Sequence, residues 1–512
     1  MNKRDITKLS KVELIEEVLR LNNKIKDQSE EISILKRFIY AKKNEKWTKE
    51  DKTFSQAFNE AENTAEEEKE QKKTDSGKGS SKSGKKPGRK PLPDDIPRNT
   101  VESDLEEDQK LCPCCGKPRP YIGATQAEKL DFELAKMTVN RYLKKKYGAC
   151  DCEAFQSRED LPQVIEAKTP DQFIPGSIAS PSLVAYIITS KFCDALPLYR
   201  QERIFERIGV SISRQNMSNW ALAASGKCED IIEHMRKVAM SGNLINMDET
   251  TVQVLNEKDR KAENKSYMWV MAGGKTDKKV VLFNYSTTRN QEIPITLLKG
   301  YRNILQTDGY AAYNKVVKEN GLWHVGCLTH ARRKFYQLSQ ASNKKGKAHK
   351  GVEFFTRLYA VESTLKKENL PPDEYLKRRR KMAIPIWKEF HIWLVKMKSK
   401  VAEGKLSEAI NYSLNQYQNL VRYLKYPEIT PDNNIAENAI RPFCVGRKNW
   451  LFNSSPRGAY SSAALYSLVE TAKINNVEPY QYLTYLFSEI QNITPESDLD
   501  ALMPWNMAKK RL

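Results

Sequence analysis

The chain has 512 residues, with 85 Lys and Arg against 65 Asp and Glu, and a formal net charge of +20. This length exceeds what one compact core usually holds, and the basic excess favours a polyanionic partner such as nucleic acid. The longest apolar run, residues 182–188, is too short for a membrane span, and residues 1–5 lead into no signal-peptide core. Nine scattered cysteines argue against a disulfide framework, so we expect a protein of the reducing cytoplasm.

Residues 1–45 contain an apolar heptad pattern. β-Branched residues recur at one core position and leucines at the other: Val18, Ile25, Ile32 and Ile39, with Leu14, Leu21 and Leu35. This combination favours a parallel two-stranded coiled coil. We therefore predict a leucine zipper that makes the chain a homodimer or a larger assembly. An amphipathic helix packed on its own chain is the alternative.

Residues 46–110 have the composition of a disordered basic linker. They are rich in Glu and Lys, then in Ser, Gly and Lys, and contain little that could form a core. Within them, residues 86–91 (Lys-Pro-Gly-Arg-Lys-Pro) are similar to an AT-hook, in which Arg89 would lie in an A·T minor groove. A simple solvated basic linker would look the same.

Residues 111–160 contain two cysteine pairs, which predict a zinc-knuckle module. Cys112 and Cys115 form a C-x-x-C turn, and Cys150 and Cys152 follow after 150 − 115 = 35 residues. Four thiolates would complete a tetrahedral structural Zn²⁺ site, with Cys114 as a substitute ligand. A redox C-x-x-C pair or unpaired thiols are the alternatives. Residues 139–147, between the pairs, are basic and strand-like.

Residues 170–240 predict an all-α helix-turn-helix region. A helix beginning at Leu198 is followed by Gly209 and by a second helix near Ser211. The second helix carries side chains suited to base edges or phosphates, namely Arg214, Gln215 and Asn219. Similar helix pairs also occur in ordinary bundles.

Residues 241–340 change to strand-like and then alternating patterns, which predict the first part of an α/β core with a mixed sheet. Strands are expected near residues 244–255, 266–272, 279–285, 303–307 and 324–329, with helices near 288–298 and 311–318. Residues 341–428 are Lys-rich and helical, and we interpret them as an insertion. Residues 429–495 would complete the core, and residues 496–512 would form a C-terminal tail.

Three acidic residues of this core are candidates for a common site. Asp248 lies on the first strand, with Glu249 on its opposite face, and Asp308 ends a later strand. Glu437 lies on the polar face of a predicted helix that begins at Asp432 and ends at Pro442. The same polar face carries Asn434, Asn438 and Arg441. The opposite face, which we expect to be buried, carries Ile435, Ala436, Ala439 and Ile440. Two strand acids and a helix acid can converge on Mg²⁺ or Mn²⁺. Each acid alone is also an ordinary turn or cap residue.

Five ordered motifs give a family resemblance: residues 247–250, 307–313, 327–335, 433–441 and 446–452. Together they resemble the transposases of the bacterial insertion sequence sixty-six family. The resemblance implies a ribonuclease-H-like fold whose DDE triad falls on Asp248, Asp308 and Glu437, separated by 308 − 248 = 60 and 437 − 308 = 129 residues. It also implies a nucleoid-associated bacterial protein that acts on double-stranded DNA, with element-encoded accessory proteins as further partners. The cysteine pairs and residues 38–47 depart from the family pattern.

Residues near these acids are candidates for supporting roles. Cys327 and His330 form a C-x-x-H pair, for which we expect a structural role rather than metal ligation, because no fourth ligand is evident. Several residues are candidates for DNA contacts: Arg332, Arg333, Lys334, Arg441, Arg447, Lys448 and, by base stacking, Trp450.

The sequence therefore predicts a multidomain DNA transposase that binds terminal inverted repeats and catalyses metal-dependent strand cleavage and strand transfer. Two alternatives remain open at this point. One is a non-catalytic DNA-binding regulator, and the other is a ribonuclease-H-like nuclease that cuts without joining.

Overall fold

The computed structural model describes residues 117, 137–148, 160, 162, 164–167, 172–340, 346–494 and 497–509. The chain divides into two compact units, Glu68–Pro170 and a larger one of Met1–Glu67 with Asp171–Leu512. The predicted coiled coil, the linker with Arg89 and the four cysteines of the predicted zinc knuckle lie outside the described residues. Within the described ranges, no helix combines the length and apolar character that a bilayer crossing requires.

The smaller unit contains one short two-stranded ladder among its described residues. β1 (Lys146–Gly148) pairs antiparallel with β2 (Val164–Glu166), and Lys146 stands opposite Glu166. The side chains of both strands are exposed. The strand character expected over residues 139–147 is therefore realised only at the end of that range.

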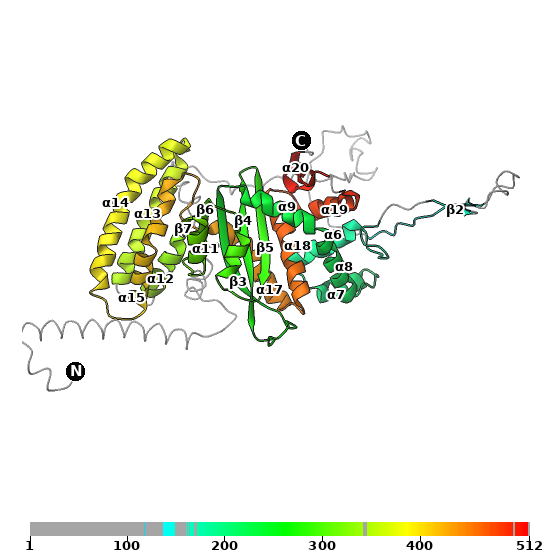
Figure 1. Cartoon of the computed structure of the whole chain (residues 1–512), viewed down its shortest axis with the longest axis horizontal. Coiled ribbons are helices and arrows are strands. Elements are labelled where there is room, and N and C mark those ends of the chain that lie inside the picture. Colours follow the sequence, from blue (N-terminus) through cyan, green and yellow to red (C-terminus); the bar gives the residue numbers. More distant parts are fainter. Residues whose placement is uncertain are drawn as a thin grey trace, which may run out of the picture. The chain divides into compact units, whose positions relative to one another are not determined.

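A five-stranded mixed sheet in the order β5-β4-β3-β6-β7 forms the centre of the larger unit (Figure 1). β3 (Leu244–Gln253), β4 (Lys265–Lys275) and β5 (Lys278–Ser286) are successively antiparallel. β6 (Ile304–Thr307) and β7 (Trp323–Gly326) continue the sheet parallel to β3. α10 (Glu292–Leu297) and α11 (Tyr313–Asn320) connect the last three strands in sequence. The predicted strand–helix alternation is thus present.

Among the described residues, four helices precede the sheet: α6 (Pro181–Phe192), α7 (Leu198–Arg207), α8 (Arg214–Lys227) and α9 (Glu229–Met240). α7 and α8 flank a turn at Gly209, whose φ of +84° favours glycine. α9 packs on β4 and β5, and α6 packs on α19 (Pro479–Glu489). The core residues of these helices belong to one hydrophobic cluster with those of the sheet.

α18 (Pro456–Ile474) protects the outer edge of β5. An edge strand exposes backbone groups that could pair with another chain. The Thr471 hydroxyl accepts a hydrogen bond from the Val281 N–H and donates one to the Val281 carbonyl, both at 3.0 Å. The Ser467 hydroxyl accepts from the Phe283 N–H at 2.8 Å. The chain then ends through η2 (Ile490–Asn492), η3 (Leu499–Leu502) and α20 (Pro504–Lys509).

A helical subdomain lies at the β7 end of the sheet (Figure 1). It comprises α12 (Leu328–Gln340), α13 (Lys347–Lys367), α14 (Pro372–Lys398), α15 (Lys405–Asn415), α16 (Tyr417–Val421) and η1 (Arg422–Lys425). A second hydrophobic cluster fills it, with Phe335, Phe355, Trp387 and Phe390 almost fully buried. Most of this subdomain falls within residues 341–428, for which the sequence predicts a helical insertion.

The helix expected to end at Pro442 is longer than predicted. α17 spans Asn434–Trp450 and contains Pro442 in its interior. Proline cannot donate to the carbonyl four residues earlier, here that of Asn438, but packing of the surrounding turns compensates for one lost bond. The start was also misplaced, because Asp432 does not cap α17. Its carboxylate accepts from the Thr329 N–H at 2.9 Å and so caps α12.

Candidate active site

Asp248 and Asp308 lie at equivalent positions on adjacent parallel strands. Asn246 of β3 pairs with Gln306 of β6, and each aspartate follows its strand's paired residue by two positions. Side chains alternate along a strand, so the two carboxylates share one face. Asp308 follows the last residue of β6, and its carboxylate accepts from the Tyr310 N–H at 2.9 Å. Such strand ends are where open α/β sheets usually hold their sites.

α17 brings Glu437 to the same end of β3. The helix packs against β3 and β4, and its buried face consists of Ala436, Ala439, Ile440, Phe443 and Gly446. Glu437 lies in its first turn. Ile435 was expected on the buried face, but it is 41% exposed, because it lies at the margin of the stripe that Ala436, Ala439 and Phe443 form. The polar and apolar faces are otherwise arranged as the sequence predicts.

Buried amide side chains fix the start of α17 to the sheet. The Asn246 amide donates to the side-chain oxygens of Gln306 and Asn433, both at 2.9 Å. Asn433 donates to the Met247 carbonyl at 2.8 Å, and Gln306 donates to the Thr430 carbonyl at 2.8 Å. We call Asn246, Gln306 and Asn433 the amide relay. All three are at most 2% exposed, so the relay sets the position of Glu437 relative to the strands.

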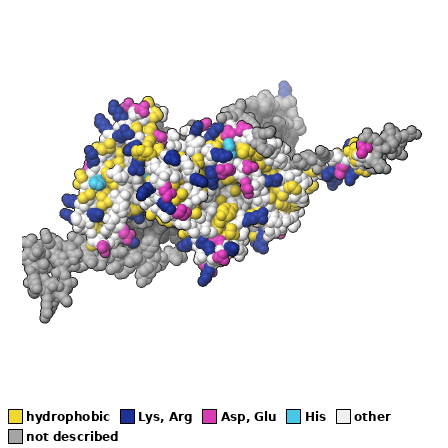
Figure 2. Space-filling view, in the orientation of Figure 1, with side chains coloured by type: hydrophobic (Ala, Val, Ile, Leu, Met, Phe, Trp, Pro, Cys, Tyr) yellow, Lys and Arg dark blue, Asp and Glu magenta, His cyan; other side chains and the backbone are white. Residues whose placement is uncertain are grey.

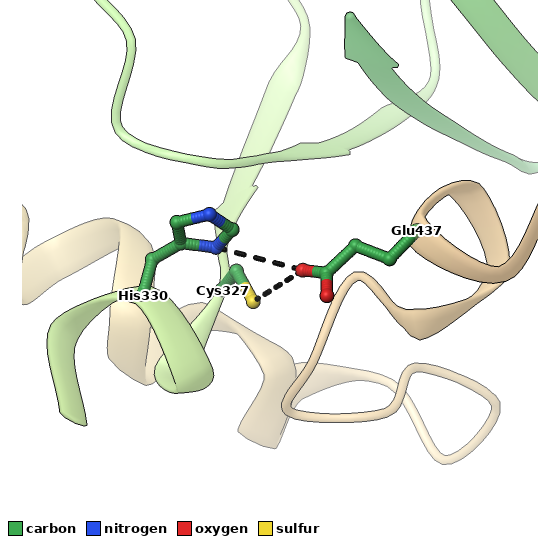
Figure 3. A group of neighbouring side chains, drawn as sticks. All are labelled: Cys327, His330 and Glu437. Atoms are coloured by element: carbon green, nitrogen blue, oxygen red, sulfur yellow. Dashed lines mark hydrogen bonds and ion pairs between the residues drawn. The ribbon is translucent and has the colours of Figure 1, made fainter. Parts of the chain in front are cut away.

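Cys327 and His330, at the start of α12, also contact Glu437 (Figure 3). Cys327 precedes α12, and His330 lies in its first turn. The Cys327 thiol donates to the Glu437 carboxylate at 3.7 Å, and Nδ1 of His330 lies 3.5 Å from the same oxygen. The Asn433 N–H donates to the Cys327 sulfur at 3.3 Å. The C-x-x-H pair therefore contacts the third acid directly.

The electrostatics of the acids suit divalent cations. Burial raises the pKa of Asp248 well above its ordinary value, and the charges of Glu249, Glu437 and Asp308 raise it further. A cation beside these carboxylates would offset the free-energy cost of ionising them. Carboxylate oxygens are also preferred ligands of Mg²⁺. Among the described residues, the three acids do not form one group with all ligand atoms within 4.8 Å, whereas Cys327, His330 and Glu437 do.

Glu249 faces away from Asp248, as predicted, and anchors a second polar cluster. Its carboxylate forms an ion pair with Arg289 and accepts from the Tyr313 hydroxyl at 2.5 Å. The Arg289 guanidinium stacks 3.7 Å from the Tyr310 ring centre, next to the turn at Asp308. Sequence reasoning missed Arg289, Tyr310, Tyr313 and the amide relay, because their roles depend on tertiary contacts. The adjacency of acidic Glu249 to Asp248 was the only signal.

The candidate DNA-contact residues near the acids lie on α12 and α17. Arg332 and Lys334 stack on aromatic rings of Tyr336 and Tyr412, at 5.0 Å and 4.7 Å from the ring centres. Arg333 lies close enough to His330 to lower its pKa, although burial is the main cause of that shift. On α17, Lys448 is exposed and Arg441 is half-buried. The helices that carry these cations are the ones that carry His330 and Glu437.

Arg447 and Trp450 are engaged within the protein. Arg447 donates to the Thr250 hydroxyl at 3.0 Å and to the backbone carbonyl of Thr251. The Trp450 ring lies edge-on to Phe443, with ring centres 5.4 Å apart. Arg447 therefore holds the end of α17 against β3, and Trp450 packs that end of the helix against the hydrophobic core. Both residues have a structural role.

The helix-turn-helix candidates are on the surface. Arg214, Gln215 and Asn219 are exposed at the start of α8, where the Gln215 amide donates to the Asn219 oxygen at 3.1 Å. Figure 2 shows Lys and Arg side chains spread over the visible face of the protein, gathering over the helical subdomain. This distribution agrees with the net charge of +20.

Three family models match the chain. "Transposase IS66 family" matches residues 176–461, "IS66 C-terminal element" matches residues 467–505, and "Transposase C of IS166 homeodomain" matches residues 27–101. The first match covers more than half of the chain and includes all three candidate acids. The chain belongs to the IS66 family of transposases. Family membership implies a DDE-type enzyme with DNA as its partner.

This IS66 transposase is similar to three proteins of Sinorhizobium fredii. "Uncharacterized protein y4qI" is 31% identical over 415 residues, which span 79% of this chain and 75% of the relative. "Uncharacterized protein y4jD" is 27% identical over 415 residues, with 78% and 79% covered. "Uncharacterized protein y4hP" is 26% identical over 419 residues, with 78% and 74% covered. The similarity therefore extends well beyond the site motifs.

Proposed function

We propose that this transposase cleaves DNA at the ends of its element and joins the freed 3′ ends to target DNA. Asp248, Asp308 and Glu437 would hold two Mg²⁺ or Mn²⁺ ions for both steps. The observation that carries the proposal is the pairing of Asn246 with Gln306, which sets Asp248 beside Asp308 at the strand ends where α17 delivers Glu437. The same three residues are the ones that the family resemblance assigns to the DDE triad.

The sheet supports a ribonuclease-H-like fold for the catalytic domain. Three antiparallel strands followed by two parallel strands, in the order β5-β4-β3-β6-β7, place the first acid on the central strand and the second after its parallel neighbour. The helical subdomain lies in sequence between the second and third acids. This arrangement accounts for the long separation between Asp308 and Glu437.

The metal ions, when bound, would activate the attacking water or 3′-hydroxyl and neutralise the leaving oxygen. The protein's own contribution is to position the carboxylates. The amide relay holds α17 against β3, Cys327 and His330 contact Glu437, and the Tyr310 N–H orients Asp308. The cations of α12, Arg332 to Lys334, are suited to holding phosphates beside the acids. No covalent protein intermediate is needed.

The other predicted modules complete the proposal. The helix-turn-helix residues and Arg89 would bind the terminal inverted repeats, as would Arg441 and Lys448 of α17. Arg447 and Trp450, whose side chains contact β3 and Phe443, would support the DNA-binding surface from within the protein. Cys112, Cys115, Cys150 and Cys152 would hold a structural Zn²⁺ ion. The N-terminal zipper would join two chains, so that both element ends are handled in one assembly.

The proposal is tested with labelled duplex that carries the element end, unlabelled target duplex and Mg²⁺. Cleavage followed by strand transfer is the expected result. Cleavage without joining would indicate a nuclease, and binding without cleavage would indicate a regulator. Either of these two results would contradict the proposed function.

A further inference from the structure

We propose that Cys327, His330 and Glu437 form a second metal site, which takes a zinc-class transition-metal ion, and that its occupation inhibits strand cleavage. The binding half of this inference stands on geometry alone. The inhibitory half rests on the proposed function, because it requires Glu437 to serve the Mg²⁺ site.

The donor set is one that zinc prefers. A thiolate, an imidazole and a carboxylate are its three usual protein ligands. Here the thiol and the imidazole come from the start of α12, and the carboxylate comes from α17. Figure 3 shows the three side chains pointing toward one another across the space between these helices. Their ligand atoms all lie within 4.8 Å of one another.

The spacing approaches that of a tetrahedral site. Zinc bonds of about 2.3 Å to sulfur and about 2.0–2.1 Å to nitrogen or oxygen place neighbouring ligand atoms roughly 3.3–3.6 Å apart. The observed separations are 3.7 Å from the Cys327 sulfur to the Glu437 oxygen and 3.5 Å from that oxygen to Nδ1 of His330. Two of the three separations are therefore within a few tenths of an ångström of tetrahedral values, and the third, between the Cys327 sulfur and the His330 imidazole, is at most 4.8 Å.

Two further features mark the site as prepared for a ligand. Nδ1 of His330 is buried and makes no hydrogen bond of good geometry within the described part of the chain, although the Glu437 oxygen lies 3.5 Å away, and a buried nitrogen that is incompletely satisfied is costly. The Cys327 sulfur already accepts a hydrogen bond from the Asn433 N–H, which orients the sulfur toward the space between α12 and α17. On binding, the thiol proton leaves to solvent.

The site discriminates against magnesium. Mg²⁺ demands oxygen ligands in near-octahedral geometry, so sulfur and nitrogen donors exclude it. Zinc accepts all three donors, and the side chains of His330 and Glu437 are 24% and 20% exposed, so water can complete the tetrahedron. Because Glu437 belongs to both sites, an ion held with Cys327 and His330 draws this carboxylate away from Asp248 and Asp308. Zinc would then compete with magnesium.

Binding is tested by titrating the full chain with Co²⁺, which reports thiolate ligation through a charge-transfer band and tetrahedral geometry through visible absorption. Cys327→Ser and His330→Gln should each lower the number of Co²⁺ ions bound per chain by one. If the ion is still bound, its affinity should fall by more than the roughly tenfold loss that follows a change outside the ligand shell. Cys444→Ser is the matched control, because Cys444 is a half-buried thiol of α17. Any Co²⁺ bound by the N-terminal cysteines is the same background in the wild type and in the three variants.

Unchanged cobalt stoichiometry and spectrum in both variants would overturn the site. Circular dichroism of the two variants ensures that a loss does not reflect unfolding. Inhibition is tested by adding Zn²⁺ to Mg²⁺-dependent cleavage, with each protein compared with its own rate in Mg²⁺ alone. The wild type should regain activity as Mg²⁺ is raised, and the Zn²⁺ concentration that halves the rate should be at least about tenfold higher for His330→Gln. Cobalt binding without zinc inhibition would overturn the inhibitory half. A zinc-free wild type that never cleaves would instead contradict the proposed function and leave the binding result standing.

Discussion

The side-chain amide of Asn433 donates to the Met247 carbonyl and accepts from Asn246, so the residue before α17 is bonded to the strand residues before Asp248. Asn246 precedes Asp248 by two positions on the strand, and Asn433 precedes Glu437 by four positions along the chain. The geometry of the third acid relative to the first thus depends on one buried amide. This relationship makes Asn433 the most informative residue outside the acids.

Asn433→Ala should lower the free energy of unfolding by about 2–3 kcal/mol, because it removes one of the two hydrogen bonds of the buried Asn246 amide and the side-chain hydrogen bond to the Met247 carbonyl. Asn434→Ala is the matched control, since Asn434 is the exposed neighbour in the first turn of α17. Denaturant unfolding measures both. Equal effects of the two substitutions would show that the relay does not stabilise the structure.

Arg379→Met should be strongly destabilising, by about 3–5 kcal/mol. The Arg379 guanidinium is buried, pairs with Glu362 and donates to the carbonyls of Tyr426 and Ile429 on the segment that leads back to α17. Its neighbour Arg378 has a side chain that is 48% exposed, so Arg378→Met should cost less than about 1 kcal/mol. Thermal or denaturant unfolding compares them, and a comparable loss in both variants would contradict this account.

The ionisation of Asp500 should make a pH-dependent contribution to the free energy of unfolding. Burial opposes its ionisation, but hydrogen bonds from Lys278, Asn506 and His234 outweigh burial and hold its pKa below the ordinary value. A carboxyl group with a depressed folded-state pKa stabilises the fold above its unfolded pKa, and this contribution disappears as the pH falls through the folded-state pKa.

Asp500→Asn should therefore lower stability by about 1 kcal/mol near neutral pH, a modest value because the Asp500 side chain is 25% exposed. The difference from wild type should shrink below about pH 4. Melting temperatures of both proteins from pH 3 to pH 7 measure it. A difference that stays constant down to the lowest pH would refute the assignment to Asp500.

The sequence predicted which residues lie at strand ends but not which strands are neighbours. Alternation correctly separated Asp248 from Glu249, and the Asp-Gly pair correctly marked the end of β6. The adjacency of Asp248 and Asp308 depends on the pairing of β3 with β6, which joins segments about sixty residues apart and leaves no local pattern.

The errors concerned positions where tertiary contacts override local preference. Pro442 is a strong helix breaker by sequence, yet Phe443 and Gly446 are buried beyond it, so packing continues α17 to Trp450. Asp432 has the chemistry of a helix cap, but the helix that it caps is α12, more than a hundred residues earlier in the chain. No local signal identifies that partner.

The most direct test of the three-acid site is the rate of Mg²⁺-dependent cleavage of an end duplex by Glu437→Gln, with duplex binding measured in parallel. Glu408→Gln, which changes an exposed acid of α15, serves as the control. We predict that Glu437→Gln binds the duplex normally and cleaves it at least about a thousandfold more slowly, a loss of about 4 kcal/mol. Cleavage by Glu437→Gln at the rate of wild type and control would contradict the account.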